Sequence, residues 1–226
     1  MRLFAKQGNK FRYTPLQIVM HLGGWLPLAR LLFDAASGNL GPNPIQDIEQ
    51  RTGRAAVTFL ILSLACTPFN TLFGWRELLR RRRALGLYAF LYACLHVLLF
   101  IDLDYGLNWR LILKAALEKR FILLGAIAFL LLLLLAVTSF DVWVTRLRKN
   151  WKRLHRLVYL IAPIVILHFA WARKGDIFRL QGDIVQPLLY GLAVVMLLVL
   201  RLPFLRRTIV SFRTRIRARR PARNPG

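Results

Sequence analysis

Long apolar runs alternate with short polar stretches along this chain. The runs cover about residues 15–33, 54–73, 84–103, 120–140, 154–172 and 184–203. Each approaches the roughly 20 residues that an α-helix needs to cross the hydrocarbon core of a bilayer. The pattern predicts an all-α fold, a polytopic membrane bundle of six transmembrane helices. We expect a single domain over residues 1–226 that ends in a basic tail, 204–226.

The stretch between the first two runs, from Gly38 to Gly53, has a different character. Glycine, proline and asparagine cluster at its start, and Ile45, Ile48 and Glu49 then follow at helical spacing. Clusters of this kind usually mark a loop. We expect a loop with a short helical turn on the outer side of the membrane. No internal repeat of fixed period is apparent along the chain.

Composition supports the membrane interpretation, and the charge pattern gives its orientation. Of the 226 residues 57% are hydrophobic, and the formal net charge is +24. A soluble protein with this charge would be a candidate for nucleic-acid binding. Here, however, the basic residues form blocks between the apolar runs, densest before the first run, at Arg80–Arg83, around Lys149 and in the tail. The positive-inside rule then predicts cytoplasmic termini, contact with membrane lipid and no nucleic-acid partner.

Histidines inside the apolar runs are the main candidates for chemistry, because a polar ring at membrane depth is costly unless something satisfies it. With a rise of roughly 1.5 Å per residue, His96 lies about 20 Å beyond Arg83, and His168 lies about 22 Å beyond Arg153. Both distances start at the inner end of a helix that runs outward, so the two rings are nearly level. Haem iron suits such a pair, since it takes axial nitrogens from opposite sides.

His155 differs from this pair, because it lies only about 3 Å past Arg153 and so close to the cytoplasmic face. We expect that it cannot bind the same iron. Alternatives stay open for each ring. His96 and His168 could form hydrogen bonds between helices without a metal, and His155 could face headgroups or water. His21 is interpreted as a structural residue of the first helix.

Four segments in order along nearly the whole chain carry a specific resemblance. They are Asn43–Arg54 (NPIQDIEQRTGR), Arg83–Tyr88 (RALGLY) before His96, Thr138-Ser139, and Trp151–Tyr159 (WKRLHRLVY) before His168. Together they resemble the MsrQ family, formerly called YedZ, within the ferric-reductase-like transmembrane group. The resemblance implies a six-helix protein of the bacterial inner membrane that carries b-type haem and FMN. It also places His96, His155 and His168 at the histidine positions of the family.

The same resemblance implies partners. Electrons would come from the quinone pool or from a cytoplasmic flavin reductase, and they would pass to MsrP, the periplasmic molybdenum-containing subunit of a methionine sulfoxide reductase system. After the last apolar run only about 25 residues remain, so we expect no NADPH- and FAD-binding module and an external source of reducing equivalents.

One departure from the wider group bears on the number of haems. Larger ferric reductases and NADPH oxidases carry two histidines on the third span, whereas here the positions about 13 residues to either side of His96 are Arg83 and Trp109. We therefore expect one haem, with His96 and His168 as its iron ligands. His155 would orient a second cofactor or support electron transfer from the inner side.

The Asn43–Arg54 segment is interpreted as a docking surface for the periplasmic partner or as an edge of the haem pocket. Arg51 and Arg54 in this segment either pair with haem propionates or are merely solvated. Both are therefore candidate cofactor-binding residues.

The leading hypothesis is an electron-transfer subunit that performs no oxygen-atom chemistry itself. A stand-alone membrane metal reductase or a quinone-linked cytochrome b is the nearer alternative. A cofactor-free transporter or assembly factor with structural histidines is the more distant one. The sequence contains no Walker loop, GxGxxG, CxxC or CxxCH motif, and it has few carboxylates of the kind that ion-coupled transporters need along their path.

Overall fold

The structure, a computed structural model, describes residues 14–173 and 184–218. Over these ranges the chain is helical apart from turns and short connections. This confirms the prediction of an all-α polytopic bundle. The predicted basic segment before residue 14 and the end of the basic tail, 219–226, lie outside the described residues.

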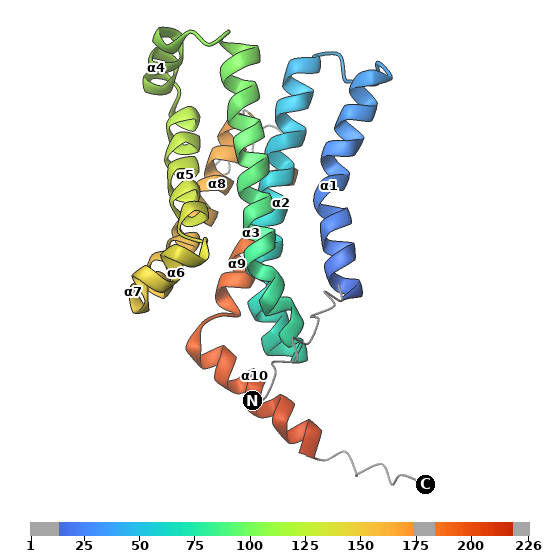
Figure 1. The fold of residues 1–226 in the computed structure, drawn as a ribbon, viewed down its shortest axis with the longest axis vertical. Coiled ribbons are helices and arrows are strands. Elements are labelled where there is room, and N and C mark those ends of the chain that lie inside the picture. The colour runs from blue at the N-terminus through green and yellow to red at the C-terminus, as the bar shows by residue number, and fades with distance from the viewer. Residues whose placement is uncertain (1–13, 174–183, 219–226) are drawn as a thin grey trace, which may run out of the picture.

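The long helices stand side by side in a bundle (Figure 1). They are α1 (Pro15–Ala36), α2 (Pro44–Phe73), α3 (Arg76–Leu99), α5 (Arg120–Val137), α8 (Val158–Ala172) and α9 (Val185–Val199). Around them lie α4 (Trp109–Glu118), α6 (Asp141–Leu147), α7 (Lys149–Leu154) and α10 (Pro203–Ala218), with a π-helical turn at Phe100–Asp104 and a 3₁₀ turn at His155–Leu157. Within the described residues, five helical segments are long and apolar enough to span a membrane, and α9 with α10 makes a sixth if this bent pair is one span.

The bundle has two distinct ends, which are named here by the helices that lie at them. The α4 end, at the top of Figure 1, contains α4 and the connection from α1 to α2. The α10 end, at the bottom, contains α6, α7, α10 and the beginning of α3. Helices α3 and α8 both run from the α10 end toward the α4 end.

The expected loop from Gly38 to Gly53 is the main correction to the sequence prediction, because α2 already begins at Pro44. The Asn43 side chain caps the helix by accepting a hydrogen bond from the backbone N–H of Gln46 at 3.3 Å. Pro44 suits the first helical position, and Asp47 in the first turn complements the helix dipole. These local signals outweigh the cluster of turn residues, which ends at the cap. The prediction also missed α4, whose cap is Asn108.

Two helix pairs form the centre of the bundle, with α2 packed along α3 and α5 packed along α8. Helix α1 packs on the outside of the first pair through Tyr92. The Tyr92 hydroxyl donates to the carbonyl oxygen of Gly24 at 2.7 Å and accepts from the N–H of Leu28 at 3.1 Å. These backbone groups flank Pro27, which interrupts the helical hydrogen bonding of α1. Tyr92 therefore holds α1 against α3 beside the proline.

Candidate functional site

His96 and His168 face one another across the boundary between the two central helix pairs. Their ring centroids are 6.3 Å apart, and the ring planes meet at 75°. His96 comes from α3 and His168 from α8, the two helices that run in the same direction. The structure thus brings together the two histidines that the sequence predicts to lie at the same depth.

Each of the two rings is held by a backbone carbonyl of the neighbouring helix in its own pair. The Nδ1 atom of His96 lies 3.0 Å from the carbonyl oxygen of Glu49 on α2. The Nδ1 atom of His168 lies 2.7 Å from the carbonyl oxygen of Phe121 on α5. A carbonyl can only accept, so both Nδ1 atoms carry the proton, and the Nε2 atoms keep the lone pairs that can bind a metal.

Two glycines make room for the rings. A Cβ atom at Gly53 would lie 3.3 Å from Cε1 of His96, and a Cβ atom at Gly125 would lie 2.8 Å from Cε1 of His168. Carbon atoms essentially never approach as closely as 2.8 Å, so at position 125 a larger residue would displace the ring. The glycines let α2 and α5 carry the hydrogen-bonding carbonyls right up to the imidazoles.

The two halves of the site repeat one another along the sequence. Positions 49, 53 and 96 become 121, 125 and 168 when 72 is added, and in both halves the histidine follows its carbonyl partner by 47 residues. No repeat is apparent in the sequence, because the match concerns single positions and two of them act through the backbone. The shared spacing of glycine and histidine was the one signal that could have revealed the site's symmetry.

This arrangement fits a haem iron. With metal–imidazole bonds of roughly 2 Å on each side, the centroids of two opposed axial rings lie about 6 Å apart. The observed separation is 6.3 Å. The donor set is also suitable, since two neutral imidazoles that each keep an Nε2 lone pair are ligands that haem iron takes. The residues present therefore fit the group.

His155 lies at the opposite end of α8, in a separate cluster. Its ring stacks on Trp151, with centroids 4.1 Å apart and planes at 29°. Its Nε2 atom lies 3.3 Å from the hydroxyl of Ser139, and its Nδ1 atom lies 3.2 Å from the carbonyl oxygen of Trp151. The Trp151 indole in turn donates to the carbonyl of Thr138 at 2.8 Å. Thirteen helical positions, roughly 20 Å, separate His155 from His168, so these two rings belong to different sites.

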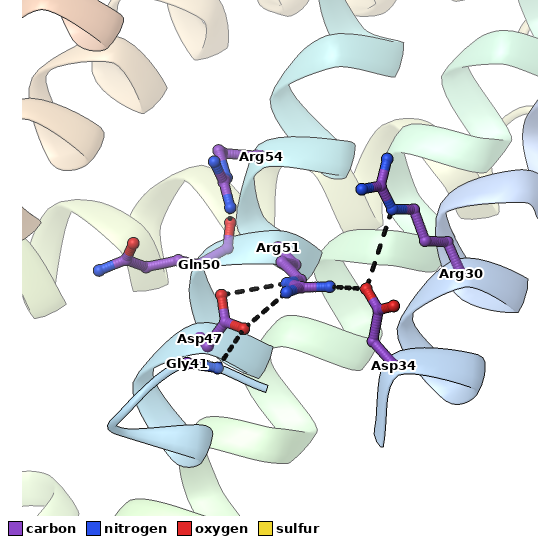
Figure 2. A network of polar contacts seen from close by, with 7 residues as sticks. All are labelled: Arg30, Asp34, Gly41, Asp47, Gln50, Arg51 and Arg54. Atoms are coloured by element: carbon purple, nitrogen blue, oxygen red, sulfur yellow. Dashed lines mark hydrogen bonds and ion pairs between the residues drawn. The ribbon is translucent and has the colours of Figure 1, made fainter. Parts of the chain in front are cut away.

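Arg51 belongs to an ion-pair network that ties α1 to α2 (Figure 2). Its guanidinium is shared between Asp34 at the end of α1 and Asp47 one turn earlier on α2. Asp47 also accepts a hydrogen bond from the N–H of Gly41 at 3.2 Å. The Arg51 guanidinium is therefore paired with two carboxylates. Its contact with Asp34 joins the first two helices.

Arg54 lies on the next turn of α2 and donates from Nε to the carbonyl oxygen of Gln50 at 3.2 Å. Both Arg51 and Arg54 line a groove of about 880 Å³ between α1, α2 and α3, and neither His96 nor His168 is among its lining residues. The pairing of these arginines with haem propionates remains a prediction.

His21, interpreted from the sequence as structural, contacts Tyr88. Its Nδ1 atom lies 2.9 Å from the Tyr88 hydroxyl, and the two rings meet edge to face. The Tyr88 ring also lies directly over Gly24, where any Cβ atom would collide with it. His21 thus takes part in packing α1 onto α3.

Comparison with known proteins places the chain among membrane proteins of one kind. Residues 52–166 match the family described as ferric reductase like transmembrane component, a range that contains Gly53, His96, Gly125 and His155 and ends two residues before His168. Together with the long apolar helices, this match shows a multi-pass membrane protein.

Curated relatives extend the match to most of the chain. A protein of Herminiimonas arsenicoxydans is 40% identical over 189 residues, which is 83% of this chain and 84% of the relative. A protein of Caulobacter vibrioides is 37% identical over 204 residues, 90% of this chain and 94% of the relative. A protein of Xanthomonas oryzae pv. oryzae is 41% identical over 165 residues, 70% of this chain and 76% of the relative. All three carry the name protein-methionine-sulfoxide reductase heme-binding subunit MsrQ.

Proposed function

The chain belongs to the MsrQ family of the ferric-reductase-like transmembrane group, and from this premise we propose that it is the haem-binding, electron-transferring membrane subunit of a methionine sulfoxide reductase system. The observation that carries the proposal is the opposed pair His96 and His168, with both Nδ1 atoms bonded to carbonyls and both Nε2 atoms available.

The residues of the site have separate tasks in this proposal. His96 and His168 would hold the iron of a haem b through their Nε2 atoms. The carbonyls of Glu49 and Phe121 fix the tautomer and orientation of the two rings, which also raises the basicity of the ligating nitrogens. Gly53 and Gly125 keep α2 and α5 close enough for those hydrogen bonds. When bound there, haem b supplies a one-electron redox centre inside the membrane.

Arg54 is the better candidate of the two arginines for pairing with a haem propionate. Arg51 already faces Asp34 and Asp47, so a further anion would have to displace a carboxylate. Arg54 makes its described hydrogen bond to a neutral carbonyl, which leaves its charge available for a charge-assisted bond.

The proposed topology places the chain in the bacterial inner membrane with the α10 end in the cytoplasm. Basic side chains concentrate at that end, including Arg80–Arg83 before the apolar part of α3 and Arg148–Arg156 around α7, as the positive-inside rule requires. The α4 end then faces the periplasm. His96 lies in the last turn of α3 on that side, which suits delivery of electrons to a periplasmic acceptor.

Membership of the family supports a proposal for the partners. We propose that electrons pass outward to MsrP, the periplasmic molybdenum-containing reductase, and that they come from the quinone pool or a cytoplasmic flavin reductase. The cluster of His155 and Trp151 lies at the α10 end, where electrons from an inner donor would arrive. FMN as a second cofactor stays a prediction, to be checked by flavin analysis of the purified protein.

Cofactor analysis of the purified protein tests the haem proposal directly. We expect a reducible haem absorption band from the wild type, lost in His96→Ala and in His168→Ala, because each variant removes one axial ligand. His21→Ala is the matched control and should keep the band, since His21 contacts Tyr88 instead. A colourless, folded wild-type protein would support the cofactor-free transporter or assembly factor.

Deletion of the chain in its host separates the proposal from the nearer alternatives. An electron-transfer subunit for sulfoxide repair predicts that oxidised periplasmic methionines accumulate after deletion and that the chain restores their repair. A stand-alone metal reductase or quinone-linked cytochrome b would retain haem, yet its deletion would leave periplasmic methionine repair unchanged.

A further inference from the structure

Helix α10 leaves the bundle at a sharp angle. It meets α9 at 73° across a break of a few residues, and in Figure 1 it runs obliquely below the other helices. Helix α9 has 15 residues, roughly 22 Å at the helical rise. Since α9 is one of the long bundle helices, a turn of this size carries α10 toward the plane of the membrane surface.

The sequence of α10 is that of an interfacial helix. At 100° per residue, Leu205, Ile209 and Phe212 fall within about 60° of one another and form one apolar strip. Phe212 is 66% exposed, so the bundle does not cover the whole strip. The helix contains several arginines and no acidic residue. A strip of apolar side chains beside uncompensated positive charge suits a boundary between acyl chains and anionic headgroups.

Two arginines fix the position of α10 against the bundle. Arg213 donates to the carbonyl oxygens of Asn70 and Thr71, both at 2.9 Å, at the end of α2. The Asn70 carbonyl also accepts from the N–H of Gly74, so Arg213 adds a second bond to the helix cap. At the bend, Arg201 donates to the Tyr159 hydroxyl and to the carbonyl of Leu64. Helix α10 is therefore held in place, while Arg206, Arg207 and Arg215 remain exposed.

We infer that α10 is a lipid-binding surface helix that binds the anionic phospholipid headgroups of the cytoplasmic leaflet. Phe212 inserts between acyl chains, and Arg206, Arg207 and Arg215 lie against phosphates. Because Arg213 joins α10 to the end of α2, lipid binding also steadies the turn between α2 and α3. The inference uses the proposed topology and is independent of the haem.

Hydrogen exchange of the full-length protein in nanodiscs tests this inference. The amides of α10 should exchange more slowly in discs that contain phosphatidylglycerol than in discs of phosphatidylcholine alone, and added salt should remove the difference. Each arginine near an anionic surface contributes roughly a fivefold change in binding. Arg206→Gln/Arg207→Gln should therefore abolish most of the lipid dependence. The control Arg110→Gln/Lys119→Gln removes two positive charges at the α4 end and should keep it.

A tryptophan reporter distinguishes insertion from mere proximity. In Phe212→Trp, lipids with brominated acyl chains should quench the tryptophan fluorescence more strongly than they quench the fluorescence of the unmodified protein. Equal exchange of α10 in both kinds of disc would overturn the inference, as would protection by a soluble acidic polypeptide but not by lipid, which would indicate a protein partner. Labelling of Ser211→Cys from one side of sealed vesicles reports the topology separately, so a failure of topology is distinguishable from a failure of lipid binding.

Discussion

The α2–α3 half and the α5–α8 half of the site each position one histidine ring in the same way, although their side chains differ. In each half a backbone carbonyl holds the histidine, and a glycine one turn later leaves space for the ring. The residue that supplies the carbonyl is Glu49 in one half and Phe121 in the other. Such unlike residues serve the same purpose because neither uses its side chain for the bond. The site is thus specified by spacing and by the absence of a side chain at two positions.

The halves differ in how tightly the glycine is enclosed, and this gives the largest predicted effect. A Cβ atom at position 125 would lie 2.8 Å from His168, against 3.3 Å from His96 for position 53. We expect Gly125→Ala to weaken haem binding by about 1–3 kcal/mol, the usual cost of overpacking, and Gly53→Ala to weaken it less. Haem titration of the two apoproteins measures the difference.

Gly23→Ala is the control for these two variants, because nothing lies within 4 Å of a Cβ atom at position 23. It should bind haem like the wild type. Equal haem affinity in Gly125→Ala and Gly23→Ala would show that the rings do not occupy the positions described for them.

A smaller effect separates Arg51 from Arg54. Arg51→Gln should lower the free energy of unfolding by about 1 kcal/mol, since Arg51 makes two half-buried ion pairs, one to Asp34 of α1 and one to Asp47 within α2. Arg54→Gln should instead reduce haem affinity and leave stability nearly unchanged. Thermal unfolding and haem titration of both variants test the distinction. The opposite assignment of effects would make Arg51 the propionate partner.

The smallest effect concerns the residues that supply the carbonyls. Glu49→Gln and Phe121→Leu change the side chains and keep the backbone, so both should retain haem affinity within about 0.5 kcal/mol, as is usual where no key interaction is lost. Haem content of the purified variants checks this. A marked loss in both would mean that side chains, rather than carbonyls, hold the rings.

Residue patterns predicted much of this architecture. Apolar runs located the helices, and counting residues from the inner helix ends placed His96 and His168 at matching depth, where the structure brings them together. The early start of α2 was misjudged because turn residues before a helix resemble those of a loop, although Asn43 and Pro44 were its cap. Gly53 and Gly125 were overlooked because their importance depends on which ring lies opposite them, which only the packing of α2 on α3 and of α5 on α8 reveals.

The most direct test of the central claim is the haem stoichiometry of the purified protein together with its electron paramagnetic resonance spectrum in the oxidised state. The account predicts one haem per chain and low-spin iron with two imidazole ligands, whose strongly anisotropic signal reflects ring planes that meet at 75°. Replacement of either His96 or His168 should abolish that signal. Persistence of the same spectrum after either replacement would contradict the claim that these two histidines hold one iron between them.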